Sequence, residues 1–384
     1  GDRLHPTATE VAWTPEVILV NYAVRPGVVG KGRGVLLDDG RIALKVMEIA
    51  GGDVVCRVTA GGHLISHKGV NLPGQKINAP SLTAKDHQDL DFSLQAGVDY
   101  VALSFVRSAD DIAELRRLIA DRTERAVRVI AKIEKHEAIR NINAIIDIAD
   151  AVMIARGDLG VEIAPERVPY WQKEIIRRAV ARGKTVITAT EMLESMIERP
   201  IPTRAEASDV ANAVYDGTDA VMLSGETAVG KYPARAVSTM HRIAKTVEST
   251  IRHRENFHAH SGKSVTDAIS AAACEISQSL VAKALVTPTS SGTTALEVAK
   301  HRPSAPLLAV SSNRDVVNQL ALVWGVQPFL VSPARDTDDM FAKAIEAVRE
   351  SGLAGPADEI VITAGVMVNV PGTTNLIKVH RMEE

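Results

Sequence analysis

The stretch AVMIARGDLG, residues 151–160, decides the fold expected for this chain. Five apolar residues, Ala151 to Ala155, run directly into Arg-Gly-Asp-Leu-Gly. A short, uniformly apolar run is typical of a strand covered on both faces, as in a parallel sheet. Polar residues that follow such a strand face the ligand site shared by the strand ends. The stretch therefore predicts a buried parallel strand that delivers a charged, glycine-containing turn to a functional site.

Four further segments repeat this pattern, with amphipathic helical patterns between them. They read DYVALSFV, RVIAKIE, TVITAT and DAVMLSG. The five predicted strands end near Phe105, Glu134, Asp158, Thr190 and Ser224. A spacing of roughly 30 residues is that of one βα unit, and a barrel is the natural closure of such units.

Two other sections flank this one, so three domains are expected from 384 residues. Residues 1–77 are rich in β-branched residues and in glycine. The segments DDG (38–40) and GG (51–52 and 61–62) are typical of the turns of β-hairpins. They predict a small all-β domain. Residues 78–248 form the β/α-barrel portion. Residues 249–384 again alternate helix and strand and predict a separate α/β domain.

Composition excludes several classes of function. With 44 basic and 47 acidic residues, the net charge of −3 gives no field that attracts nucleic acid or an anionic membrane. Apolar runs are too short to span a membrane, and no signal-peptide pattern begins the sequence, so a cytoplasmic protein is expected. Cys56 and Cys274 are isolated, which supports neither a disulfide framework nor a thiolate zinc site.

The strand ends carry a ring of polar side chains: Ser104, Arg107, Lys132, Glu134, Arg156, Asp158, Thr190, Ser224 and Glu226. The period of two in VIAKIE puts Lys132 and Glu134 on the same side of one strand. Glu134 and Asp158, on adjacent strands, could hold one divalent cation such as magnesium. A structural Lys-Glu ion pair is the simpler interpretation of any single pair, but five successive polar strand ends favour a ligand site.

The glycines of RGDLG leave backbone N–H groups free to approach an anion at the start of a predicted helix. Together with a lysine and a metal, this combination suits a phosphate or an enolate oxyanion. GKS at 262–264 is not a P-loop, because Phe257 occupies the required glycine position. His258 and His260 are interpreted as solvated linker residues rather than as metal ligands.

A second candidate phosphate site follows the predicted strand ALVTPT. Thr289, Ser290, Ser291, Gly292, Thr293 and Thr294 would place hydroxyls and N–H groups at a helix N-terminus. An ordinary capped turn explains the same residues equally well.

Several of these segments resemble the pyruvate kinase family. VIAKIEKHEAI, VMIARGDLGVEI, ITATEMLESMI, PTRAEASDVANAVYDGTDAVMLSGETAVGKYP and KGVNLPG are similar to that family's signature segments. The resemblance runs from about Val11 to the C-terminus. It implies a small all-β lid domain, a (β/α)8-type barrel that is incomplete in this chain, and a C-terminal α/β effector domain.

Carried over by position, the resemblance gives each site residue a role. Lys132 bridges the transferred phosphoryl group and the enolate oxygen, while Glu134 and Asp158 are metal ligands. The backbone of Gly157 and Asp158 and the Thr190 hydroxyl hold the substrate carboxylate. Ser224 lies near the proton path, Lys68 reaches nucleotide phosphates, and the loop 289–294 binds an effector phosphate.

The implied reaction is transfer of a phosphoryl group from phosphoenolpyruvate to ADP, giving ATP and pyruvate, the last step of glycolysis. The implied cofactors are Mg²⁺ or Mn²⁺, with K⁺ held by ligands that this chain lacks. The implied effector is a sugar phosphate or a nucleotide, and the implied assembly is an allosteric homotetramer. No nucleic-acid or membrane partner is expected.

Two departures from the family pattern stand out. Glu191 follows Thr190 where the family commonly has glutamine, which adds negative charge near the site. The family's three barrel strands before the lid, with their substrate, monovalent-cation and nucleotide ligands, have no counterpart here. Because five strands cannot close an eight-stranded barrel, we expect either a longer protein or a partner chain to supply the rest, and the isolated 384-residue chain not to be fully active.

Two alternatives remain open from the sequence. A magnesium-dependent lyase or aldolase acting on phosphoenolpyruvate would also end adjacent strands in Glu and Asp, although it needs no nucleotide-binding lysine. A catalytically impaired subunit that senses phosphorylated metabolites would keep the C-terminal loop.

Overall fold

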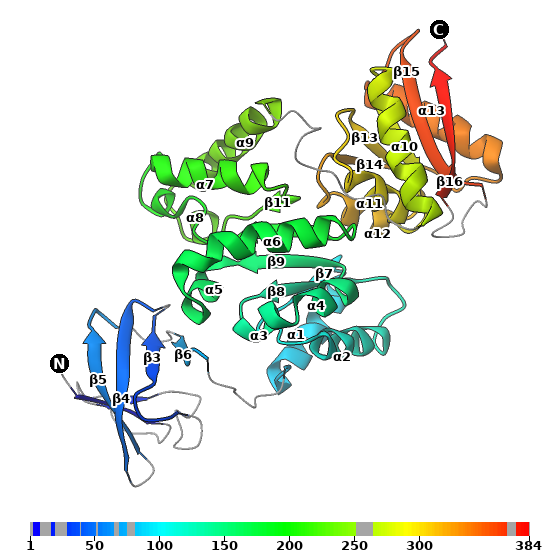
Figure 1. The fold of residues 1–384 in the computed structure, drawn as a ribbon. Helices are drawn as coiled ribbons and strands as arrows, with labels where there is room; N and C mark the ends of the chain where they lie inside the picture. The colour runs from blue at the N-terminus through cyan, green and yellow to red at the C-terminus, as the bar shows by residue number, and fades with distance from the viewer. Residues whose placement is uncertain are drawn as a thin grey trace.

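A computed structural model of the protein describes residues 3–7, 17–19, 29–38, 40–50, 53–64, 69–74, 81–250, 264–366 and 374–383. Three sheets follow one another along the chain, and the N-terminal sheet and the C-terminal sheet lie at opposite ends of the molecule (Figure 1). The middle section carries the predicted site.

The N-terminal sheet has six strands in the order β2-β1-β5-β4-β3-β6. The strands are β1 (Arg3–Thr7), β2 (Val17–Leu19), β3 (Gly34–Leu37), β4 (Ile42–Ala50), β5 (Asp53–Ala60) and β6 (Val70–Asn71). Its buried core includes Val35, Leu44, Val54 and Cys56. The section is all-β, as the sequence predicts. The expected hairpin at 61–62 is wrong, however, because the next strand, β6, pairs with β3 rather than with β5.

The middle sheet is parallel, with the strand order β11-β10-β9-β8-β7. Its strands are β7 (Tyr100–Leu103), β8 (Arg128–Ile133), β9 (Ala151–Ala155), β10 (Thr185–Ala189) and β11 (Ala220–Val221). Every residue of β9 and β10 is buried, as expected. β7 and β11 are only partly buried, which corrects the expectation of uniform burial. Both are edge strands among the described residues, so each is paired on one side only.

Helices cover this sheet and alternate with its strands (Figure 1). They are α1 (Ala84–Gln95), α2 (Ala109–Ala120), α3 (His136–Arg140), α4 (Ile142–Ile148), α5 (Arg156–Glu162), η1 (Pro165–Arg167), α6 (Val168–Val180), η2 (Glu194–Ile197), α7 (Arg204–Tyr215), α8 (Gly225–Ala228) and α9 (Pro233–Thr250). The main core of the section lies between β7–β10 and helices α2, α4 and α6, and it includes Ile112, Ile133, Ile145, Ile154 and Ile176.

The segment RGDLG is not a turn, which corrects the sequence-based prediction. Helix α5 begins at Arg156, immediately after β9, so both glycines lie inside a helix. Leu159 is fully buried and anchors this helix to the core. Asp158 lies in the first turn, where a negative charge interacts favourably with the helix dipole.

The C-terminal sheet has the strand order β14-β13-β12-β15-β16, with only β16 antiparallel to its neighbour. Its elements are α10 (Val265–Ser279), β12 (Ala284–Pro288), α11 (Thr293–Ala299), β13 (Leu307–Ser311), α12 (Arg314–Leu320), β14 (Val326–Leu330), α13 (Thr337–Ser351), β15 (Glu359–Gly365) and β16 (Thr374–Arg381). Strand β14 was not predicted. It contains Pro328, which a strand tolerates at the sheet edge, and an edge strand has a weaker apolar signal.

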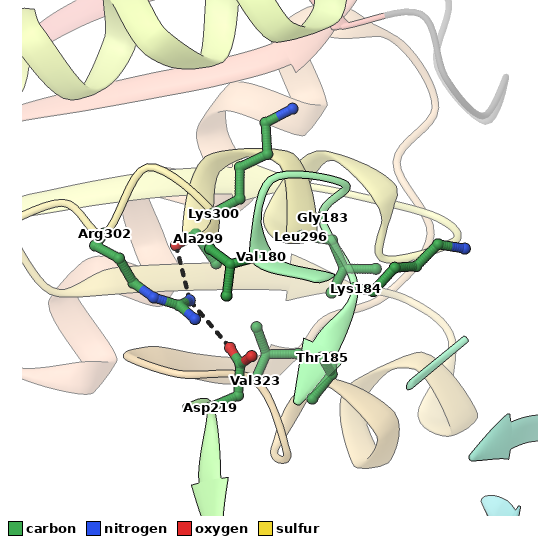
Figure 2. Close-up of a pocket in the computed structure, with 10 residues that line it drawn as sticks. All are labelled: Val180, Gly183, Lys184, Thr185, Asp219, Leu296, Ala299, Lys300, Arg302 and Val323. Carbon is green, nitrogen blue, oxygen red and sulfur yellow. Dashed lines mark hydrogen bonds and ion pairs between the residues drawn. The ribbon is translucent and has the colours of Figure 1, made fainter. Parts of the chain in front are cut away.

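The C-terminal domain packs against the amino ends of the middle strands, opposite to the strand exits. Arg302 donates hydrogen bonds to Asp219 (3.0 Å) and to the carbonyl of Gly217 (2.8 Å). Asp219 also accepts from the backbone N–H groups of Trp324 and Val186. A cavity of about 10 Å³ lies beside this ion pair, enough for a single water molecule (Figure 2). The ion pair and its backbone contacts thus join two domains.

No helix in the described part of the chain is both long enough and apolar enough to cross a membrane.

Candidate functional site

Lys132 lies near the end of β8 and points into the strand-exit region. Its Nζ atom lies 2.6 Å from Oε1 of Glu134 and donates a 3.0 Å hydrogen bond to Oγ of Ser104. One quarter of the lysine side chain is exposed, while Glu134 is 1% exposed. The predicted placement of Lys132 and Glu134 on one side of the strand is therefore confirmed. The ammonium group is oriented by two partners yet remains accessible to a ligand.

Glu134 is fixed between two neighbouring strands. Its Oε2 accepts a 2.7 Å hydrogen bond from the backbone N–H of Phe105, just beyond β7. Phe105 has a φ of 56°, which lies in the left-handed region. The strained backbone there turns the N–H toward the carboxylate and fixes its orientation.

Thr190 and Gly157 join the ends of β10 and β9. The Gly157 N–H donates a 2.8 Å hydrogen bond to Oγ1 of Thr190, and this hydroxyl donates to the carbonyl of Ala189. A Cβ atom at Gly157 would lie 3.6 Å from Thr190 Oγ1, so the two segments approach closely. Thr190 (φ 66°) and Glu191 (φ 54°) are both left-handed, which no feature of the sequence indicates.

A cavity of about 880 Å³ lies along α1 and the length of edge strand β7. It reaches Ser104, Phe105 and Asp158 at one end, and residues 69–71, at and just before β6, line it from the N-terminal section. Lys132, Glu134, Gly157 and Thr190 do not line it. The N-terminal sheet also approaches helix α5, since a Cβ at Gly40 would lie 3.9 Å from Cγ2 of Val161. The N-terminal section therefore lies close to α5, the helix that carries Asp158.

Two carboxylates could hold a divalent cation. Glu134 and Asp158 follow adjacent strands, in which Ile133 pairs with Ile154. Among the residues that the structure describes, no group of three or more His, Cys, Asp or Glu side chains could hold a metal ion. Magnesium needs only one or two carboxylates, because water and substrate oxygens complete its shell. Both carboxylates are hard oxygen donors of the kind that magnesium prefers. Glu134 would exchange its contact with Lys132 for the cation, because its two oxygens contact the Lys132 ammonium and the Phe105 N–H in this structure.

The fifth strand exit is built around a buried carboxylate. Glu226 is 1% exposed and accepts hydrogen bonds from the backbone N–H groups of Leu193 and Ser224. It thereby holds the Ser224 backbone at the beginning of α8. Burial raises the pKa of the nearby Glu194, and the carboxylates of Glu226 and Glu191 raise it further. Glu191 therefore does add negative charge to this region.

The loop 289–294 connects β12 to α11 in the C-terminal domain. Thr289 Oγ1 accepts from the Gly292 N–H (2.9 Å), and the hydroxyls of Ser291 and Thr293 are hydrogen-bonded to each other. The Thr294 hydroxyl is buried against Thr374. Arg128, at the start of β8, donates to the carbonyl of Ser291 (3.0 Å), so the loop contacts the barrel section. Its binding function stays a prediction.

Some sequence-based predictions concern other residues. Lys68, His258 and His260 lie outside the described residues. Gln172 and Asp209 were missed, although both bind the guanidinium of Arg156. No sequence signal could have found them, since ordinary helical patterns surround both residues.

A parallel β/α sheet with a lysine, two carboxylates and a threonine at its strand ends places the chain among α/β proteins, in which this edge of the sheet carries the ligand site. Models of known families match the chain as "Pyruvate kinase, barrel domain" over residues 4–237 and as "Pyruvate kinase, alpha/beta domain" over residues 267–380. The chain belongs to the pyruvate kinase family.

Individual relatives agree with this assignment. The chain is 48% identical over 385 aligned residues to a pyruvate kinase of Geobacillus stearothermophilus, covering 99% of this chain and 66% of the relative. It is 47% identical to pyruvate kinase 2 of a Synechocystis strain, covering 99% and 64%. The crystal structure of a pyruvate kinase from Cryptosporidium parvum superimposes with a TM-score of 0.91 at 36% identity, covering 99% and 78%. The chain thus spans about two thirds of the length of the first two relatives.

Proposed function

We propose that the protein catalyses the magnesium-dependent transfer of a phosphoryl group from phosphoenolpyruvate to ADP, giving pyruvate and ATP. Membership of the pyruvate kinase family supports this reaction. The observation that carries it is the Lys132 ammonium, held by buried Glu134 and by Ser104 at the end of β8. The Gly157–Thr190 contact lies at the ends of β9 and β10, the next two strands of the same sheet.

Lys132 supplies positive charge where the reaction develops negative charge. Phosphoryl transfer needs mainly positioning and charge neutralisation, because its loose transition state spreads charge over oxygen atoms. A lysine about 4 Å from such a charge gains roughly 4 kcal/mol at an effective dielectric constant of 20. In this proposal Lys132 bridges the transferred phosphoryl group and the enolate oxygen.

The substrate carboxylate would bind at the Gly157–Thr190 contact. The backbone N–H groups of Gly157 and Asp158 lie in the first turn of α5, where partial positive charge favours an anion. The Thr190 hydroxyl, which now accepts from Gly157, would turn toward the carboxylate when that ligand binds. The Ser224 side chain would lie near the path by which the enolate carbon gains its proton.

Glu134 and Asp158 would hold Mg²⁺ or Mn²⁺. When bound, the divalent cation neutralises charge on the phosphoryl and enolate oxygens. K⁺ belongs to this proposal by family resemblance alone, because the family segment that carries its ligands has no counterpart among these 384 residues.

The remaining parts of the proposal concern the other domains. Residues 1–77 would act as a lid that brings Lys68 to the nucleotide phosphates, residues 78–248 as the barrel portion, and residues 249–384 as a regulatory domain. The loop 289–294 would bind a sugar phosphate or a nucleotide effector. The protein would act in the cytoplasm as an allosteric homotetramer.

A coupled assay tests the reaction. The whole natural protein, with any segment or partner chain that completes the barrel, is expected to form pyruvate from phosphoenolpyruvate and ADP in the presence of Mg²⁺, detected as NADH oxidation by lactate dehydrogenase. Pyruvate formation that does not need ADP would support the lyase alternative instead. Magnesium-dependent binding of phosphoenolpyruvate without turnover would support the sensing subunit, which no comparison with known proteins favours.

A further inference from the structure

We propose that Arg156 is a positioning residue that holds the backbone of Thr190 and Glu191 in its left-handed conformation and so orients the Thr190 hydroxyl for the substrate carboxylate. This inference rests on the proposed function of Thr190.

The conformation that needs support is unusual. Thr190 (φ 66°) and Glu191 (φ 54°) are consecutive residues with side chains, and both adopt a conformation that favours glycine. Such a conformation persists only when surrounding contacts determine it, and it occurs often at functional sites. It is also what brings Thr190 Oγ1 to within 2.8 Å of the Gly157 nitrogen.

The Arg156 guanidinium binds the two carbonyl groups that frame this turn. Nε donates to the carbonyl of Ala189 (3.2 Å), and Nη2 donates to the carbonyl of Thr190 (2.8 Å). Nη2 also lies 2.8 Å from Sδ of Met192, the residue after the turn. One side chain therefore contacts the residues before, within and after the left-handed pair.

Two other elements hold the guanidinium in place. Its Nη1 and Nη2 atoms each lie 2.7 Å from one carboxylate oxygen of Asp209 on α7, a bidentate pair. Nη1 also donates to Oε1 of Gln172 on α6 (3.2 Å), and Gln172 donates to Asp216 at the end of α7. Helices α6 and α7 thus fix the donor, and the donor fixes the strand-exit backbone.

Arg156 is unsuited to direct ligand binding. Its side chain is only 10% exposed, and all three of its guanidinium nitrogens already donate to protein acceptors. Its own backbone begins α5, so the same residue adjoins the Gly157 N–H and supports Thr190. A lysine would keep the positive charge but could not bridge Asp209 and two carbonyls, because it lacks the planar fork of arginine.

The test compares Arg156→Lys with Arg178→Lys in the whole natural protein used for the pyruvate assay. Arg178 is a matched control, since it forms an ion pair with Glu174 on the same helix α6 and has no contact with the strand exits. We expect Arg156→Lys to raise the KM for phosphoenolpyruvate roughly ten- to hundredfold while leaving the KM for ADP within about twofold. Arg178→Lys should change neither.

Two further variants separate positioning from general structural support. If Arg156 acts through the Thr190 hydroxyl, Arg156→Lys should add nothing to the KM defect of Thr190→Ala. Glycine adopts the left-handed region without strain, so Glu191→Gly should restore most of the phosphoenolpyruvate KM in the Arg156→Lys protein. Any of three results would overturn the inference. The KM effects of Arg156→Lys and Thr190→Ala could be additive, Glu191→Gly could fail to restore the phosphoenolpyruvate KM, or Arg156→Lys could raise the KM for ADP as much as that for phosphoenolpyruvate.

A binding measurement keeps the inference distinct from the proposed activity. Oxalate, a planar dicarboxylate with the shape of the pyruvate enolate, can be titrated calorimetrically in the presence of Mg²⁺. If the unsubstituted protein forms no pyruvate, the proposed function fails. Arg156→Lys should still weaken oxalate binding roughly tenfold. In the Thr190→Ala protein, the same Arg156→Lys substitution should have no further effect on oxalate binding. An unchanged oxalate affinity, or none in the unsubstituted protein, would refute the role of Arg156.

Discussion

The Nζ atom of Lys132 lies 2.6 Å from Oε1 of Glu134, two residues further along the chain and just beyond the end of β8; the lysine side chain is 25% exposed and that of Glu134 is 1% exposed. The pair presents one positive charge at the strand exit and buries its counter-charge. This asymmetry is what allows Lys132 to serve a ligand instead of merely neutralising Glu134.

Lys132→Met should therefore lower the turnover number by about two to three orders of magnitude, as loss of an oxyanion donor does. The coupled pyruvate assay measures this directly. Lys85→Met removes an exposed lysine that is paired with Asp89 and serves as the control. Wild-type turnover in the Lys132→Met protein, with its fold verified by thermal unfolding, would rule out the proposed role.

Glu134→Gln keeps the volume of the side chain and removes its charge. If Glu134 is a metal ligand, the Mg²⁺ concentration that gives half-maximal activity should rise roughly 10- to 100-fold, and Asp158→Asn should behave similarly. Glu166→Gln, on the exposed turn η1, is the control. An unchanged Mg²⁺ requirement in both ligand variants would show that the cation binds elsewhere.

Arg302 and Asp219 are each only 3% exposed, and they join the C-terminal domain to the barrel section. Arg302→Met leaves the Asp219 carboxylate buried without its cation, which should reduce the free energy of unfolding by about 3–5 kcal/mol. Arg182→Met breaks the exposed pair with Asp147 and should cost less than about 1 kcal/mol. Urea unfolding measures the free energy of unfolding of both variants. Equal losses would contradict the interpretation that the Arg302–Asp219 pair is a buried ion pair between the two domains.

Gly292 has a φ of +86°, and an added Cβ would lie 2.9 Å from Nη2 of Arg128 and 3.3 Å from Leu320 Cδ2. Gly325 also has a positive φ, of +67°, but has nothing within 4 Å of an added Cβ. Gly325→Ala should cost about 1–2 kcal/mol for its backbone alone. Gly292→Ala should cost more, because it also displaces Arg128 from the Ser291 carbonyl. Thermal unfolding that ranks the two variants the other way would contradict this.

Burial raises the pKa of the Cys56 thiol to about 11 and that of Cys274 to about 12. Both thiols should therefore stay protonated and resist iodoacetamide at pH 8 in the folded protein, and both should react after unfolding. The thiols of the unfolded chain ionise near pH 8.5. Below that pH each buried thiol adds its full share to the free energy of unfolding. This share is lost as the pH rises from about 8.5 toward the folded pKa, by at most about 1.4 kcal/mol per pH unit for each thiol. Cys274→Ala should therefore make the free energy of unfolding fall less steeply with pH. Rapid reaction of the native protein with iodoacetamide at pH 8 would contradict the prediction that both thiols stay protonated.

The sequence determined the features that depend on local pattern. Uniformly apolar segments followed by polar residues predict the parallel strands β8, β9 and β10, and they place Lys132 and Glu134 on one side of β8 because side chains alternate along a strand. The signature segments identified the family. Where the apolar pattern is weak, as in β14 with its proline, the sequence did not predict the strand.

Only the tertiary structure decided how the strand ends meet. Residue Ala189 of β10 pairs with Ala155 of β9, and this register brings Thr190 to Gly157 across 33 positions of sequence. The left-handed backbone at Thr190 and the contact of Arg156 with Asp209 on α7 likewise depend on segments that lie far apart in the sequence. Each depends on contacts between residues far apart in the sequence, and a local sequence pattern carries no information about such contacts.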